Sequence, residues 1–250
     1  MNRIILLGGG VGPLAGLELH RLVLQNTKAN KDQEHLRIIH LSCPDLIEDR
    51  TECLLAGEPE KPALGMAEIL LAGAEAASRL AMSCVAGIPC NTFHAAPIWE
   101  QFTRRLTAAG FIHPVLNMIE ETISHILTRY NYARNIGILS TTGTRNFKIY
   151  SEPLQRYGLN VIEAQDQEKT HSLIYNPDWG IKSQTSISQR ARIALQEQIL
   201  ELENKGAELI ILGCTELPLA IQGTPSFQTP LLDPMNILAA RLVSVASSNK

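Results

Sequence analysis

Short apolar runs recur along the chain, with helical patterns between them. The runs are rich in Ile and Leu and lack the alternating polar positions of a strand with one solvated face. Such runs are typical of parallel strands that helices cover on both faces. The runs that predict strands are residues 3–8, 37–42, 135–140, 160–163 and 208–213. Because strands alternate with helices, the pattern predicts a parallel α/β fold.

Three apolar stripes at helical spacing lie between these runs. Gly206 is well placed as the C-terminal stop of the third predicted helix. The stripes are Met66, Ile69, Leu70, Gly73, Ala77 and Leu80; Ile119, Ile123 and Ile126; and Leu195, Ile199 and Leu202.

The second half of the chain echoes the first. "RIILLGGGVGP" begins at Arg3, and "NIGILSTTGT" begins at Asn135; each reads as a strand, a turn of small residues and a helix. Later in each half a strand end carries a cysteine, in "GIPCNTFH" and in "IILGCTELP". The echo favours two similar lobes, although strand–glycine turns recur by coincidence in any α/β chain.

Composition removes several classes of function. With 250 residues, 45% of them hydrophobic, the chain can form one large domain or two smaller lobes around a sizeable core. The net charge is −3 and there is no basic run, so nucleic acid is not the expected partner. Glycines break the apolar start, which we interpret as a first strand and not a signal peptide. No apolar segment reaches about 18 residues, so we expect no membrane span.

The five cysteines do not form the pattern of a secreted disulfide protein. Their number is odd and their spacings are long, which favours free thiols and the reducing cytoplasm. Cys90 and Cys214 stand out, because each follows an apolar run at the expected end of a strand. Ligands of parallel sheets bind beyond those ends, near helix N-termini that favour thiolates. From the residues alone, each cysteine can be a buried hydrophobe, half of a disulfide, a metal ligand, a nucleophile or an acid–base group.

A metal site finds little support in the sequence. Cys90 and His94 are four residues apart, but no C-x-x-C or H-E-x-x-H pattern accompanies them. A zinc ion needs three or four converging ligands.

The glycine turn after the first predicted strand has two readings. Gly10, Gly12 and Ala15 satisfy the dinucleotide pattern, but the acidic residue that should follow the second strand is represented only by Asp45, which comes late. We favour a tight turn whose amides face a small anion, with Pro13 as the first residue of the helix.

Other side chains could bind a carboxylate. Arg50, in "EDRT", could grip one with two hydrogen bonds, and Lys169 has a similar status; both could equally be solvated surface cations. Thr141 and Thr142, in "STTGT", offer hydroxyls and amides for an anion, although a plain helix cap would look the same.

Taken together, these segments resemble the aspartate/glutamate racemase family, and most closely its aspartate racemase branch. The resemblance covers nearly the whole chain, and the two cysteine segments are its most specific part. Its segments are residues 9–15, 32–35, 49–51, 89–94, 118–122, 141–144, 213–216 and 233–235.

The resemblance implies two pseudo-symmetric α/β lobes, each with a parallel sheet flanked by helices, and an active site in the cleft between them. We place the lobes at residues 1–115 with 227–250, and at residues 116–226. It further implies a racemase without cofactor or metal that acts on a dicarboxylic amino acid, and a homodimer. Cys90 and Cys214 match the two catalytic positions. The expected substrate-binding residues are Gly10, Val11, Gly12, Arg50, Asn91, Thr92, Thr141, Thr142, Lys169, Thr215 and Glu216, with His94 as an auxiliary residue.

Three positions depart from the family pattern. Val11 stands where Met is usual, Gly16 where Thr is common, and Phe93 where a small residue is usual. Because we expect these positions near the cleft, they bear on the choice of substrate.

The expected reaction interconverts L- and D-aspartate, or glutamate, through two bases. One cysteine removes the α-proton, and the other delivers a proton to the opposite face. Fixed donors such as Arg50 would stabilise the charge of the intermediate. The alternatives are a related reaction of the hydantoin racemase, maleate isomerase or decarboxylase type, a dinucleotide-dependent oxidoreductase, and a protein that binds amino acids without turnover.

Overall fold

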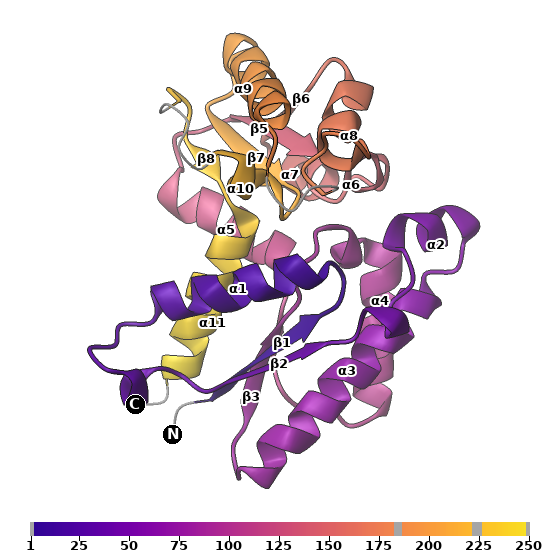
Figure 1. Ribbon diagram of the computed structural model, residues 1–250, viewed down its shortest axis with the longest axis vertical. Coiled ribbons are helices and arrows are strands. Elements are labelled where there is room, and N and C mark those ends of the chain that lie inside the picture. The colour runs from indigo at the N-terminus through magenta and orange to yellow at the C-terminus, as the bar shows by residue number, and fades with distance from the viewer. Residues whose placement is uncertain (1–2, 183–186, 222–226, 249–250) are drawn as a thin grey trace. The chain divides into compact units, whose positions relative to one another are not determined.

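The chain forms two compact units, each built around its own sheet (Figure 1). The computed structural model describes residues 3–182, 187–221 and 227–248. The first unit comprises Met1–Thr122 and Met235–Lys250, and the second comprises Ile123–Pro234. Along the sequence, the second unit is thus inserted into the first. The lobe boundary expected at residue 226 lies outside the described residues.

The sheet of the first unit has four parallel strands in the order β2, β1, β3, β4. They are β1 (Ile4–Gly9), β2 (Ile38–Ser42), β3 (Cys84–Gly87) and β4 (Val115–Leu116). Every residue of β1 and β3 is buried, as the apolar runs predict for strands covered on both faces. Since the strands are parallel, their carboxyl ends meet at one edge.

The sheet of the second unit repeats this arrangement. Its strands are also parallel, in the order β6, β5, β7, β8. They are β5 (Asn135–Ser140), β6 (Asn160–Glu163), β7 (Leu209–Gly213) and β8 (Leu231–Leu232). In both sheets the first strand along the chain pairs with the second on one side and the third on the other. The echo between the two halves of the sequence is therefore a real repeat, and the prediction of two similar α/β lobes is confirmed.

Helices flank both sheets (Figure 1). In the first unit they are α1 (Pro13–Asn26), α2 (Arg50–Ala56), α3 (Glu60–Arg79), α4 (Ala96–Ala108) and α11 (Pro234–Ser247), and α5 (Met118–Arg129) leads into the second unit. The second unit adds α6 (Thr142–Asn146), α7 (Ser151–Arg156), α8 (Gln167–Tyr175), α9 (Gln189–Asn204) and α10 (Leu217–Ile221). Short 3-10 turns occur at Asp32–Glu34, Pro44–Leu46 and Thr92–His94.

Each unit has its own hydrophobic core. In the first, the apolar residues of α1 and the C-terminal α11, two helices that cross in Figure 1, form one cluster with Ile5, Leu7 and Val85 of the sheet. In the second, residues of α8 and α9 form a cluster with Leu139, Ile210 and Leu212.

The predicted helical stripes are buried, with one exception. Leu80 is 55% exposed, because α3 ends at Arg79 and Leu80 already lies in the turn that follows it. Its inclusion in the stripe was wrong. Gly206 lies just beyond α9 with a φ of +86°, a conformation that glycine adopts without strain, so its prediction as a helix stop is confirmed.

Candidate functional site

The carboxyl edge of the first sheet brings together the glycine turn, Arg50 and Cys90. The turn follows β1, the segment with Arg50 follows β2, and Cys90 follows β3. Gly10 has a φ of +96°, and a Cβ there would lie 2.8 Å from the carbonyl carbon of Cys43. The turn therefore needs glycine both for its conformation and for its close backbone approach.

Arg50 is bound to that turn, so it is not a freely solvated surface arginine. Asp49 caps α2 by accepting hydrogen bonds from the backbone N–H groups of Thr51 and Glu52, at 2.8 and 2.9 Å. This fixes Arg50 at the first helical position, where its Nη2 donates to the carbonyl of Val11 over 2.7 Å. No side chain of the described residues caps the start of α1, whose N-cap is Gly12. The first amides of α1 and the guanidinium thus lie at one edge, and both favour an anion.

Cys90 lies in a segment that His94 holds in place. Cys90 and His94 are buried, with exposed fractions of 8% and 6%. Nδ1 of His94 lies 2.7 Å from the carbonyl oxygen of Cys90 and must donate, because a carbonyl only accepts. The ring stacks on Trp99, with 4.9 Å between centroids. Burial lowers the pKa of His94 to about 4, so its ring is neutral at neutral pH.

Two of the family departures have structural explanations in the first unit. Phe93 is fully buried and packs edge-on against Phe102, 5.2 Å between centroids, so its side chain belongs to the core. These contacts give Phe93 a packing role in the first unit, and its nearness to the expected cleft stays a prediction. A Cβ at Gly16 would lie 2.6 Å from Nε2 of His40, so this histidine fills the space that a larger residue would need.

In the second unit, Cys214 directly follows β7, as its apolar run predicts. Its Sγ lies 3.0 Å from Oε2 of Glu216, and the same oxygen accepts a hydrogen bond from Oγ1 of Thr215 over 2.9 Å. Nζ of Lys182 lies 3.5 Å from the other carboxylate oxygen. Burial and then the Glu216 charge raise the pKa of the Cys214 thiol, while Lys182 lowers it.

The neighbouring strand end contributes hydroxyls. Oγ1 of Thr141 accepts a hydrogen bond from the backbone N–H of Thr144 over 3.2 Å, so Thr141 caps α6. Oγ1 of Thr142 lies 3.1 Å from Nδ1 of His171. The His171 ring stacks on Tyr175, and Lys182 lies over the Tyr175 ring, 4.9 Å from its centroid.

The described residues show neither a metal cluster nor a membrane helix. Within residues 3–182, 187–221 and 227–248, no three His, Cys, Asp or Glu side chains gather as metal ligands would. In the same ranges, no helix has the length and apolar character to cross a bilayer. All five cysteines are free thiols.

Comparison with known proteins places this geometry in a family. The family model described as Asp/Glu/Hydantoin racemase matches residues 9–242. The chain belongs to this family. Racemases are isomerases, so membership of this family supports racemase chemistry. The family description names aspartate, glutamate and hydantoin, and it does not say which of them this chain uses.

Solved structures share the fold of this racemase-family chain. An aspartate racemase from Picrophilus torridus has a TM-score of 0.76 at 24% identity, with 98% of this chain and 94% of that one covered. An aspartate racemase homologue from Pyrococcus horikoshii has a TM-score of 0.71 at 23% identity, with 99% of this chain and 100% of that one covered. A glutamate racemase from Francisella tularensis has a TM-score of 0.65 at 17% identity, with 99% of this chain and 82% of that one covered. At these identities the likeness establishes the fold.

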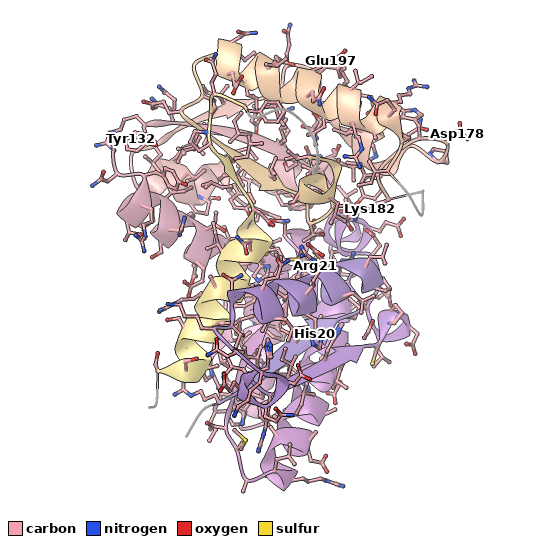
Figure 2. The ribbon with its side chains drawn as sticks, turned by 60° about the vertical axis from the view of Figure 1, so that its left-hand side comes forward. His20, Arg21, Tyr132, Asp178, Lys182 and Glu197 are labelled. Atoms are coloured by element: carbon pink, nitrogen blue, oxygen red, sulfur yellow. The ribbon has the colours of Figure 1, made fainter. Side chains whose placement is uncertain are left out.

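Sequence reasoning selected Lys169 and did not find Lys182, the lysine that contacts Glu216. Nζ of Lys169 binds Glu197 of α9 over 2.8 Å, and both side chains are about half exposed. Figure 2 shows Lys182 and Glu197 on different sides of the second unit. Lys182 follows α8 in a segment with no motif, so only its contact with the "CTE" of residues 214–216 could reveal it.

Proposed function

We propose that this chain is a cofactor-independent racemase that interconverts L- and D-aspartate through Cys90 and Cys214. One observation carries the proposal: each cysteine follows the third strand of its own sheet, β3 or β7, in two sheets of identical order. A single nucleophile or a structural thiol needs no such duplicate.

Racemisation needs two proton-transferring groups. The α-proton leaves one face of the carbon, and another proton arrives on the opposite face. One cysteine enters the cycle as a thiolate and takes the α-proton; the other enters as a thiol and gives its own. Afterwards the two cysteines have exchanged protonation states. The reverse direction runs the same two transfers backwards, so the number of protons is conserved.

The first unit supports a substrate with a carboxylate. Arg50 and the amides that begin α1 lie at the edge where Cys90 follows β3. As the α-proton leaves, charge develops on the substrate carboxylate, and donors already fixed in place stabilise it without reorganisation. Asn91 and Thr92 directly follow Cys90 in the same segment, and Thr215 directly follows Cys214. We assign them to the same carboxylate-binding role, together with Thr141, Thr142 and Lys169.

Solvent isotope incorporation tests the mechanism. The protein is incubated in deuterated water with each enantiomer of aspartate, and the product is analysed by chiral chromatography and mass spectrometry. We expect the opposite enantiomer to carry deuterium at the α-carbon. Product without deuterium would exclude proton abstraction.

Cysteine variants test the assignment of the two bases. Cys90→Ser and Cys214→Ser should each reduce racemisation by at least about a thousandfold, since a serine hydroxyl is a far weaker acid than a thiol. Cys84→Ala is the matched control: Cys84 is equally buried but lies within β3, and racemisation should persist. Wild-type turnover in either serine variant would refute the two-base assignment.

A substrate screen separates this function from its relatives. All common L- and D-amino acids, a hydantoin and maleate are incubated with the protein, with and without NAD(P). We expect turnover of aspartate or glutamate alone and no response to the nucleotide. Turnover of another substrate would move the assignment to the corresponding related reaction.

We also propose a cytoplasmic homodimer. The free thiols of all five cysteines suit a reducing compartment. Light scattering of the purified protein measures the oligomeric state, and a mass of 27.5 kDa, that of one chain, would contradict the dimer.

A further inference from the structure

The thiol of Cys214 is engaged by a buried carboxylate. The Sγ–Oε2 distance to Glu216 is 3.0 Å, and the two residues are only 4% and 8% exposed. An ionised carboxylate only accepts hydrogen bonds, so the proton between sulfur and oxygen belongs to the thiol. Oγ1 of Thr215 donates to the same oxygen and fixes its position.

One cation compensates this carboxylate from a different element. Nζ of Lys182, in the segment after α8, lies 3.5 Å from Oε1 of Glu216, and its side chain is 28% exposed. Among the described residues, Glu216 and Lys182 are the charged groups that act on the Cys214 thiol. They act in opposite directions: the carboxylate favours the thiol, and the ammonium favours the thiolate.

We propose that Glu216 is a positioning residue that holds Cys214 as a thiol in the substrate-free protein, so that Cys214 begins the cycle as the proton donor. This inference rests on the proposed function and changes the role expected for Glu216, from contact with substrate to control of a cysteine. The two cysteines are then unequal at rest, since the initial base must be Cys90.

Electrostatics explains the preference. A thiolate at Cys214 would lie 3.0 Å from the carboxylate, in a buried site where like charges repel strongly. Burial alone also disfavours the charged form, and both effects raise the pKa of this thiol. When Cys214 acts, its S–H bond breaks, a C–H bond forms at the α-carbon, and the sulfur remains as a thiolate. Repulsion from Glu216 then favours return of a proton to Cys214.

Alkylation of Cys214 measures its protonation state without substrate or turnover. In a Cys90→Ser background, iodoacetamide modification of the Cys214 peptide is followed by mass spectrometry across a range of pH. The midpoint of the rate profile reports the thiol pKa, whereas access to the sulfur changes only the maximal rate. Glu216→Gln keeps the side-chain shape and removes the charge. It should move the midpoint to lower pH and raise the rate at neutral pH by at least about tenfold, the change in thiolate fraction for one pKa unit.

A second variant must move the profile the other way. Lys182→Met removes the compensating cation, so the midpoint should rise and alkylation should slow. Lys205→Met is the matched control, because Lys205 pairs with Glu201 over 2.7 Å at the end of α9. This control should leave the profile unchanged. A general loosening of the unit would accelerate alkylation in both test variants and could not produce opposite shifts.

The outcome is decisive in either direction. An unchanged or higher midpoint in Glu216→Gln overturns the proposal. If that variant does not fold, Lys182→Met decides alone, and an unchanged or lower midpoint overturns it. Failure of the isotope experiment would instead reject the racemase function and leave the thiol–carboxylate result standing.

Discussion

His94 is a polar side chain whose location in a core depends on one hydrogen bond and one ring contact. Its Nδ1–H is satisfied by the carbonyl of Cys90, and its ring is covered by Trp99. Of the two ring nitrogens, Nε2 is buried and makes no hydrogen bond within the described residues, which an uncharged ring tolerates far better than an imidazolium. Because the buried ring disfavours a second proton, the stability of the folded state should be sensitive to acid.

We expect the first unit to lose stability as the pH falls below about 6.5 because of His94. The unfolded chain binds a proton near that pH, whereas the folded ring, with a pKa of about 4, does not. Between about pH 7.5 and 5 the loss should be about 2 kcal/mol, since each pKa unit corresponds to 1.36 kcal/mol.

Urea unfolding at the two pH values, followed by Trp99 fluorescence in a Trp179→Phe background, measures this loss. His94→Asn removes the titrating group, and its loss over the same interval should be smaller by that amount. An equal loss in wild type and variant would contradict the assignment.

At the residue scale, the sequence could single out only those candidate residues that stand in a recognisable short motif. Cys90 and Cys214 lie in short segments of distinctive composition after β3 and β7, and Arg50 begins α2, so the local pattern could single out all three as candidates. Lys182 was not a candidate, because its contact with Glu216 joins segments 34 residues apart (216 minus 182). Nothing in local spacing distinguishes it from Lys169, which pairs with Glu197.

At the scale of elements, the packing of α3 on β1 depends on a missing side chain. Gly73 is buried on the apolar stripe of α3, and a Cβ there would lie 2.2 Å from Cδ1 of Leu6. Glycine costs about 1 kcal/mol in a helix relative to alanine. The close approach of helix and strand explains why the position is nevertheless glycine.

Gly73→Ala should therefore destabilise the protein, although alanine is the better helix former. Overpacking of a core costs about 1–3 kcal/mol, which exceeds the gain in helix propensity. We expect a net loss of up to about 2 kcal/mol in urea unfolding. Ser78→Ala, at an exposed position of the same helix, should be neutral or slightly stabilising. Stabilisation by Gly73→Ala would show that Leu6 moves aside without cost.

The sequence predicted the long elements better than the short ones. Five of the strands were predicted to within about one residue, because buried parallel strands are continuous apolar runs. The strand that precedes Cys90 was expected from its cysteine segment, without bounds. β4 and β8 have two residues each, too few to form any pattern.

At the scale of the whole molecule, each unit has its own core, and α11 shares the core of the first unit with α1, far from it in the sequence. Leu238 and Leu242 of α11 are fully buried in one cluster with residues of α1, β1 and β3. The backbone N–H of Arg3 also donates to the carbonyl of Ala246 over 3.0 Å. The first unit is therefore incomplete until the last helix is in place.

Paired core truncations should act on separate units. Leu242→Ala removes a buried side chain of the first unit and Leu202→Ala one of the second, and each should cost about 2–5 kcal/mol. Hydrogen exchange with mass spectrometry should show faster exchange in β1 and β3 for Leu242→Ala, and in β5 and β7 for Leu202→Ala. Equal acceleration in all four strands would show that the chain unfolds as one cooperative body.

The position of α11 also determines the order in which a growing chain can fold on the ribosome. Domains generally fold as units while synthesis proceeds at about 5–20 residues per second. Here all residues of the second unit have been synthesised before α11, which supplies part of the core of the first. The unit whose synthesis begins first is therefore completed after the other, and until α11 has been synthesised, the apolar residues of β1 and α1 lack this part of their core.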